Sequence, residues 1–125
     1  MNTILIVDDE YDIVSTLEMI LSFEGFTVSI AFHGAEALGK LANSPLPDLI
    51  ISDVSMPVLD GYAFVKALKS DVKYASIPII LMSAAQLDNS RLADKSYDLF
   101  IRKPFDVDRL LNDVRKLLSV KLGKV

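Results

Sequence analysis

The sequence predicts an α/β domain built on a parallel β-sheet, and three observations carry this prediction. The chain has 125 residues, which is the usual size of a single domain with one core. Five short apolar segments rich in β-branched residues recur along it, and segments with helical periodicity separate them. Such alternation of strand and helix is typical of parallel strands joined by right-handed crossovers.

The five predicted strands are short and apolar. The first, third and fourth are nearly continuous apolar runs, which is typical of parallel strands that are covered on both faces. Helices should therefore pack on both sides of the sheet. The strand segments are TILIVD at 3–8, FTVSIA at 26–31, DLIISD at 48–53, PIILMS at 78–83 and YDLFIR at 97–102.

Helical periodicity is clear in three of the gaps between strands and again after the last strand. The first helix repeats apolar residues at i, i+4, i+7 and i+8 and should stop at Gly25. The last runs over 107–118, with Asp106 placed as its N-cap. The apolar positions that define the four helices are Ile13, Leu17, Ile20 and Leu21; Ala35, Leu38 and Leu41; Tyr62, Val65 and Leu68; and Val107, Leu110, Leu111, Val114, Leu117 and Leu118.

The segment AQLDNSRLADKS at 85–96 has the weakest pattern. It must return the chain from the fourth strand to the fifth, but only Leu87, Leu92 and Ala93 could face a core. We expect a short fourth helix there, which makes five helices in all.

Composition excludes several classes of site and partner. The chain has no cysteine and one histidine, so it can form neither a disulfide nor a thiolate or histidine-based zinc site, and any metal must be held by oxygen. A net charge of −4 disfavours direct binding to nucleic acid. With no apolar run of about 20 residues and no leader-like start, we expect a cytoplasmic protein without membrane contact.

Polar residues that could bind a ligand or take part in a reaction lie at the ends of four of the predicted strands. Asp8 and Asp9 follow the first, Asp53 the third, Ser83 the fourth and Lys103 the fifth. Parallel strands end at one edge of the sheet, where ligands bind in this class of fold. Clustered carboxylates repel one another, so we expect a hard divalent cation, Mg²⁺ with Mn²⁺ as the alternative, to neutralise them.

Asp53 is the candidate nucleophile of this predicted site. A carboxylate can attack a phosphoryl group and carry it as an acyl phosphate. Phosphoryl transfer depends mainly on charge neutralisation and alignment, which the Lys103 ammonium and the Ser83 hydroxyl could supply to the phosphoryl oxygens.

Five motifs occur in an order and at spacings that resemble the receiver domain of two-component response regulators: LIVDDE, GAEAL, PDLIISDVSMPVLDGY, PIILMSA and FIRKPF. The resemblance covers essentially the whole chain. It implies a flavodoxin-like, doubly wound five-stranded sheet of order 2-1-3-4-5. We expect a receiver domain over 1–121 with a short tail at 122–125, of the stand-alone chemotaxis or sporulation type.

The resemblance also implies roles for individual residues. Asp53 matches the phosphoacceptor, Ser83 and Lys103 its catalytic partners, and Ser83 with Phe100 the switch pair. The donor would be a histidine kinase or a histidine phosphotransfer protein, and an unidentified output protein would read the altered surface. The implied metal ligands are Asp8, Asp9, Asp53 and the Ser55 backbone carbonyl, and Pro104 is the implied structural residue, after a cis peptide bond. Pro57 and Gly61 are turn residues by their own chemistry and should hold the loop beside Asp53.

Several alternatives remain open at this level. Asp8 and Asp9 could cap a helix, and Phe100 could be an immobile core residue. A flavin carrier would need a Gly, Ser or Thr-rich loop where this chain has carboxylates, and a phosphatase would usually need a second Asp where it has Ser55. The chief rival is a pseudo-receiver that binds a partner without phosphorylation. On the favoured reading the chain is a signalling domain whose only catalysis is its own phosphorylation and dephosphorylation.

Overall fold

The computed structural model describes residues 2–92 and 96–121. The predicted tail at 122–125, and Ala93 of the weak segment, lie outside these residues. The elements follow one another as β1 (Thr3–Val7), α1 (Tyr11–Phe23), β2 (Thr27–Ala31), α2 (Gly34–Asn43), β3 (Leu49–Asp53), α3 (Gly61–Lys69), β4 (Ile79–Ser83), the 3-10 turn η1 (Asn89–Arg91), β5 (Leu99–Arg102) and α4 (Val107–Lys121).

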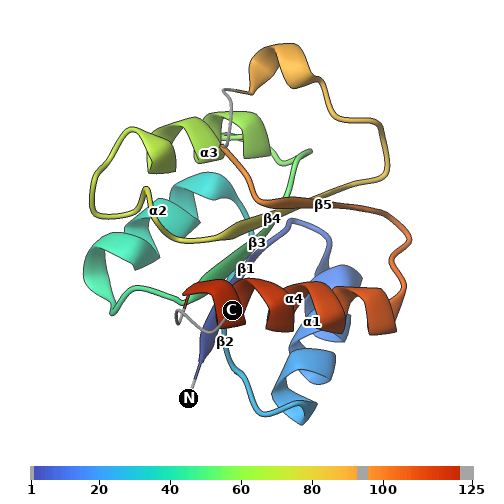
Figure 1. Ribbon diagram of the computed structural model, residues 1–125. Coiled ribbons are helices and arrows are strands. Elements are labelled where there is room, and N and C mark those ends of the chain that lie inside the picture. The colour runs from blue at the N-terminus through green and yellow to red at the C-terminus, as the bar shows by residue number, and fades with distance from the viewer. Residues whose placement is uncertain (1, 93–95, 122–125) are drawn as a thin grey trace.

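The five strands form one parallel sheet in the order β2-β1-β3-β4-β5 (Figure 1). The α/β class, the five strands and their doubly wound order are confirmed. The register aligns the strand ends, since Asp53 pairs with Met82 and Ser83 pairs with Arg102. Residues just beyond β1, β3, β4 and β5 are therefore brought to one edge.

Helices cover both faces of the sheet, as the apolar strands predict. α1 and α4 lie on one face, where Leu17 and Val114 are buried against Ile6 and Ile51 (Figure 1). α2 and α3 lie on the other face, where a second core cluster includes Phe64. Successive apolar residues of a strand belong to alternate clusters, because their side chains point to opposite faces of the sheet.

The prediction of five helices is wrong, because the described part of the chain contains four α-helices and the single 3-10 turn η1. The side chain of Asp88 accepts hydrogen bonds from the amide and the hydroxyl of Ser90, 3.1 and 2.6 Å long. Such local bonds favour a turn over a continuous helix. Leu87 is buried and Leu92 half-buried, so this segment has few apolar anchors to hold a helix against the sheet.

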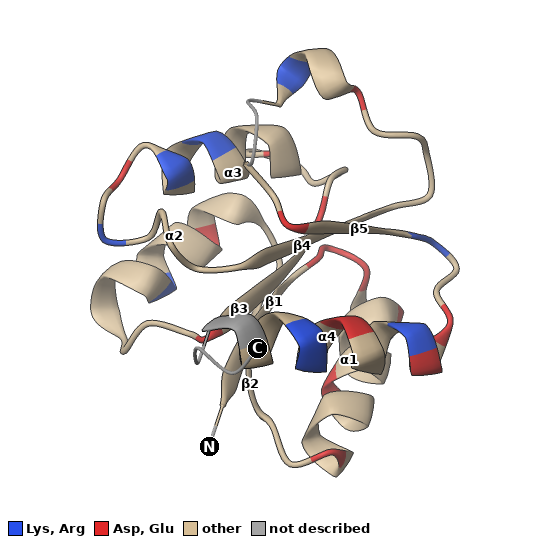
Figure 2. Ribbon diagram, in the orientation of Figure 1, with Lys and Arg blue, Asp and Glu red and all other residues tan. Residues whose placement is uncertain are grey.

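Helix ends follow the sequence signals. Gly25 adopts φ +94°, a conformation that favours glycine, directly after the C-cap of α1. At the start of α4 the Asp106 carboxylate accepts a hydrogen bond of 3.0 Å from the Asp108 amide, which confirms the predicted cap. Acidic and basic residues are interspersed along α4 (Figure 2), and no helix in the described ranges is long and apolar enough to cross a membrane.

Candidate functional site

Four strand ends supply the side chains of the candidate site. Asp8 follows β1, Asp53 ends β3, Ser83 ends β4 and Lys103 follows β5. Asp8, Asp53 and Ser83 are buried, with 0%, 3% and 5% of their surface exposed. Burying polar groups costs desolvation free energy unless they find partners. A cluster of such groups at one edge of the sheet is therefore a candidate functional site.

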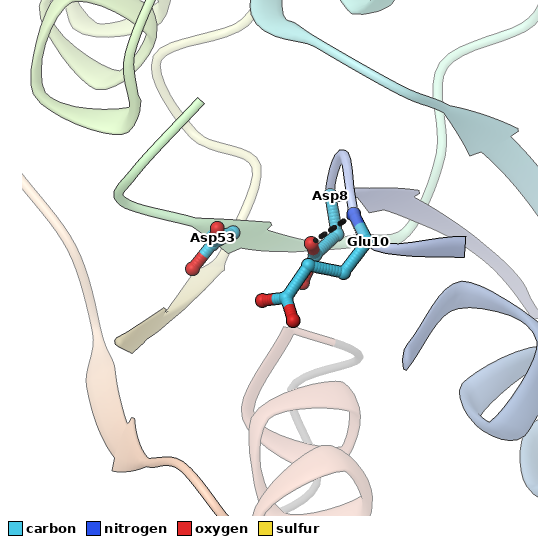
Figure 3. A group of neighbouring side chains, drawn as sticks. All are labelled: Asp8, Glu10 and Asp53. Atoms are coloured by element: carbon cyan, nitrogen blue, oxygen red, sulfur yellow. Dashed lines mark hydrogen bonds between the residues drawn. The ribbon is translucent and has the colours of Figure 1, made fainter. Parts of the chain in front are cut away.

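Lys103 is the centre of the cluster. Its Nζ lies 3.0 Å from Asp8 Oδ2, 2.8 Å from Glu10 Oε1 and 3.2 Å from Asp53 Oδ1. Figure 3 shows the three carboxylates gathered beyond the ends of β1 and β3. Because one ammonium carries a single charge, these three acidic groups keep an excess of negative charge.

The pKa values report this balance. Burial and the neighbouring Asp8 charge raise the pKa of Asp53 to about 6, although Lys103 opposes the shift. Burial also raises the pKa of Asp8 above its ordinary range, against the opposing bonds from Glu10 and Lys103. Burial alone would lower the pKa of Lys103, but bonds to Glu10 and Asp8 and the charges of Asp8 and Asp53 raise it overall.

Glu10 is a member of the cluster that the sequence reasoning did not single out. It follows β1 by three residues, and its exposed side chain turns back to bind Lys103. The alternative that Asp8 or Asp9 caps α1 fails, because the N-cap is Glu10, which makes no side-chain cap bond. Asp8 instead accepts a hydrogen bond of 2.9 Å from the Glu10 amide, shown dashed in Figure 3.

Asp9 lies on the solvent side of the same site. It is exposed, and it lines a cavity of about 310 Å³ whose other walls come from the cluster and from the residues after β3 and β4. The cavity leads to the Asp53 carboxylate from solvent. Its other lining residues are Glu10, Asp53, Ser55, Ser83, Ala84, Ala85 and Lys103.

Ser83 and Phe100 occupy neighbouring strands. The Ser83 hydroxyl accepts a hydrogen bond of 3.0 Å from the Ala85 amide, so it is engaged by its own loop. The Ser83 carbonyl accepts a bond of 2.9 Å from the Lys103 amide, which ties the ends of β4 and β5 together. Phe100 pairs with Leu81 and is half-buried against the cluster on the α2 and α3 face.

The loop from Asp53 to α3 is fixed at Gly61. The Gly61 amide donates a bond of 2.8 Å to the Val54 carbonyl, and a Cβ at this position would lie 2.5 Å from the Asp53 carbonyl oxygen. Only glycine fits so close to the backbone. In the same loop Ser55 and Pro57 are exposed, and Val58 adopts φ +68° with 86% of its surface exposed. After β5, the Lys103–Pro104 peptide bond is cis, as the resemblance implies.

The acidic residues fit a small, hard divalent cation. Carboxylate oxygens of Asp8, Glu10 and Asp53 all lie within 4.8 Å of one another. Mg²⁺ prefers oxygen ligands about 2.1 Å away, which places ligand atoms about 3 to 4 Å apart. The donor set therefore satisfies the chemistry of such an ion, and the excess negative charge favours its binding.

Comparison with known proteins identifies a family that matches most of the chain. Residues 4–115 match the response regulator receiver domain. Response regulator Rre1 of a Synechocystis strain is 36% identical over 120 residues, covering 94% of this chain and 52% of that protein. Transcriptional regulatory protein PrrA of Mycobacterium tuberculosis is 38% identical over 117 residues, covering 92% of this chain and 49% of that protein. The chain thus spans about half the length of these curated relatives.

Solved structures agree with the sequence matches. The signal receiver domain of a histidine kinase from Syntrophus aciditrophicus superposes with a TM-score of 0.87 at 36% identity, covering 95% of this chain and 91% of that one. Response regulator TrrA from Thermotoga maritima, solved in complex with Mg²⁺-BeF, gives a TM-score of 0.83 at 34% identity, covering 94% of this chain and 99% of that one.

Proposed function

The chain belongs to the response regulator receiver domain family, and from that premise we propose that it is the phospho-accepting switch of a two-component or phosphorelay system. One observation carries the proposal: a buried aspartate at the end of β3 has a lysine ammonium 3.2 Å away and lines a cavity open to solvent. These are the groups that an acceptor of a phosphoryl group requires. Their joint presence favours phosphorylation over the pseudo-receiver alternative.

Asp53 is the proposed phosphoacceptor. A carboxylate oxygen of Asp53 attacks the phosphorus of a phosphohistidine, an O–P bond forms, and the N–P bond breaks with its electron pair returning to the imidazole. In the later hydrolysis a water oxygen attacks the phosphorus, the bond from phosphorus to the Asp53 oxygen breaks, and inorganic phosphate leaves with the Asp53 carboxylate restored. The raised pKa of Asp53 means that the ionised, nucleophilic form dominates above about pH 6.

Lys103 and a divalent cation are the proposed charge-stabilising groups. Lys103 Nζ, already 3.2 Å from Asp53 Oδ1, would bind a phosphoryl oxygen once the carboxylate carries the group. Asp8, Asp9, Asp53 and the Ser55 backbone carbonyl would hold Mg²⁺, with Mn²⁺ as a substitute, whereas Glu10 stays paired with Lys103. The bound ion supplies positive charge to the phosphoryl oxygens.

Ser83 and Phe100 are the proposed readout. The Ser83 hydroxyl accepts a bond from the Ala85 amide, and a phosphoryl oxygen at Asp53 would be a charged acceptor toward which Ser83 moves to donate its O–H. Its movement would open space beside β4 into which the half-buried Phe100 ring turns. Pro57, Gly61 and Pro104 keep the surrounding loops in place.

The proposed partners follow from this chemistry. A histidine kinase or a histidine phosphotransfer protein donates the phosphoryl group, and an output protein or an output domain reads the changed surface. We place this exchange in the cytoplasm, without direct contact to nucleic acid or membrane. We also propose that 1–121 is the functional receiver unit.

Intact mass spectrometry tests the proposal. The protein is incubated with Mg²⁺ and acetyl phosphate, and a single phosphoryl adduct is expected. The adduct should vanish in Asp53→Asn and when EDTA replaces Mg²⁺. Asp108→Asn, an exposed acidic residue on α4, serves as the matched control and should retain the adduct.

Either of two outcomes would contradict this function. A folded protein that binds Mg²⁺ but gains no phosphoryl mass would favour the pseudo-receiver. An adduct that persists in Asp53→Asn would place the acceptor elsewhere.

A further inference from the structure

The turn η1, which stands where the sequence predicts a fourth helix, is attached to the start of α3 through Arg91. Arg91 Nη2 lies 3.0 Å from Asp60 Oδ2. The guanidinium also stacks on the Tyr62 ring, 4.3 Å from its centroid. A third contact joins the same elements, because the Asp88 amide donates a bond of 2.8 Å to the Tyr62 hydroxyl.

On the α3 side, these contacts reach residues that are rigidly connected to Asp53. The Asp60 carboxylate caps α3 by accepting a bond of 2.9 Å from the Ala63 amide. The next residue, Gly61, packs against the backbone of Asp53 and Val54. The start of α3 therefore cannot shift without disturbing the end of β3.

On the η1 side, the contacts restrain the segment that carries Ser83. Asp88 and Arg91 follow Ser83 by five and eight residues, and the Ser83 hydroxyl is engaged within that segment by the Ala85 amide. The segment is thus held at both ends, by Ser83 in β4 and by the three contacts to Tyr62 and Asp60. Movement of Ser83 toward Asp53 requires this segment to move as well.

We propose that Arg91 is a positioning residue that holds the Ser83 segment in its resting arrangement and so opposes the phosphorylated one. The inference rests on the proposed function, since it concerns how readily Asp53 and Ser83 reach the phosphorylated state. Asp60 and Tyr62 form the fixed side of this restraint. Arg91 also lines an open cavity with Asp9 and Ser55, so it stands beside the entrance to the site without contacting Asp53.

The direction of the effect separates this role from simple electrostatics. Removing a cation near an anion site by itself weakens anion binding. Releasing a restraint on the resting state strengthens it, because less of the binding free energy is used to shift the conformational equilibrium. Loss of Arg91 should therefore tighten the binding of a phosphoryl analogue.

The probe is beryllofluoride with Mg²⁺, titrated by calorimetry. Arg91→Ala should bind it about fivefold more tightly than the natural chain, within the usual range of coupling between sites. Asp60→Asn breaks the ion pair but leaves the stacking of Arg91 on Tyr62, and asparagine keeps the helix cap, so it should give a smaller increase in the same direction. The double variant should show no further gain over Arg91→Ala, and Arg91→Lys should fall between.

Arg115→Ala is the matched control, because Arg115 forms an exposed ion pair with Glu24 between α4 and the end of α1. It should leave the affinity unchanged, and thermal melts record any loss of stability in each variant. Unchanged or weaker binding by Arg91→Ala, in a natural chain that binds the probe, would overturn the role of Arg91. Failure of the natural chain to bind would instead contradict the proposed function.

Discussion

Lys103 Nζ lies 3.2 Å from Asp53 Oδ1, although β4 separates the two strands that carry these residues. The long lysine side chain passes the end of β4 to reach Asp53. Its Nζ also lies 3.0 Å from Asp8 Oδ2. One cation thereby stabilises two buried carboxylates. The stability of the fold and the chemistry proposed for the site should therefore both depend on Lys103.

Replacing Lys103 with methionine should destabilise the fold at neutral pH. The variant keeps the length of the side chain but leaves Asp8 and Asp53 buried without their cation, and breaking such a buried pair costs about 3 kcal/mol. Chemical denaturation in EDTA measures the loss at pH 7. The deficit should shrink as the pH falls toward 4, because protonation of Asp53, whose pKa is raised to about 6, removes one of the unpaired charges, and a constant deficit across that range would contradict the explanation.

Asp53→Asn should stabilise the metal-free protein at pH 7. The pKa of Asp53 rises from 3.8 to about 6 on folding, so the folded state binds more protons between these values and loses stability as the pH rises through them. At about 1.4 kcal/mol per pH unit, the ionised group costs up to about 3 kcal/mol above pH 6. Urea melts in EDTA should show the gain at pH 7 and its disappearance near pH 4.

Asp108→Asn provides the reference for that measurement, because Asp108 is exposed on α4. It should not reproduce the gain in stability at pH 7 that is expected of Asp53→Asn. A gain in Asp53→Asn that is equally large at both pH values would rule out titration as its cause.

Gly61→Ala should be strongly destabilising, whereas Gly39→Ala should not. A Cβ at Gly61 would lie 2.5 Å from the Asp53 carbonyl oxygen and 2.7 Å from Val54 Cα, and both are backbone atoms that cannot move aside cheaply. A Cβ at Gly39, within α2, meets nothing within 4 Å. There alanine should add about 0.5 to 1 kcal/mol through helix propensity. Thermal melts of the pair should move in opposite directions.

Val58→Asn should stabilise the loop after Asp53. Val58 has φ +68°, which a β-branched residue adopts only with strain, and its 86% exposure means that little packing is lost. Relief of the strain should give about 1 kcal/mol. Val72→Asn is the control, because Val72 is 90% exposed and is not among the positive-φ residues of the described chain. Equal shifts in the two melting temperatures would contradict the strain at Val58.

Mg²⁺ affinity should distinguish Asp9 from Glu10. Glu10 is already paired with Lys103 at 2.8 Å, whereas Asp9 is exposed at the cavity beside Asp53 and Ser55. Asp9→Asn should therefore lower the affinity for Mg²⁺ by about tenfold or more, the usual effect of losing a contact that supports a metal site. Glu10→Gln should change the affinity for Mg²⁺ by about twofold at most. Isothermal titration decides, and the reverse ranking would assign Glu10 as the ligand.

Most of the site could be predicted from the sequence, because parallel strands end at one edge of the sheet. Asp8, Asp53, Ser83 and Lys103 each lie at or directly after an apolar run, so recognising the runs also locates the residues. The order of the strands came from the resemblance to a family, since the apolar pattern alone fits several orders. Glu10 was not assigned to the site, because its role depends on a side chain that turns back toward Lys103, which no periodicity encodes.

The fourth helix shows where pattern reasoning fails for a physical reason. Leu87 and Leu92 are five residues apart, a spacing that does not place them on one face of a helix. The Asp88 side chain accepts a bond from the Ser90 amide. Asp88 and Arg91 both contact Tyr62, which lies 26 positions before Asp88 in the chain. Long-range contacts of this kind decide the local structure, and a local window cannot contain them.

The bonds of Lys103 to Asp8 and Glu10 join positions 95 and 93 residues apart, which has a consequence for synthesis of the chain. Until β5 has been translated and has docked at the edge of the sheet, the two acidic segments have no cation between them. A nascent chain, or a fragment cut before β5, therefore lacks the assembled acceptor. Under the proposed function, a chain could accept a phosphoryl group only after the whole sheet has formed, so incompletely folded copies would not be phosphorylated.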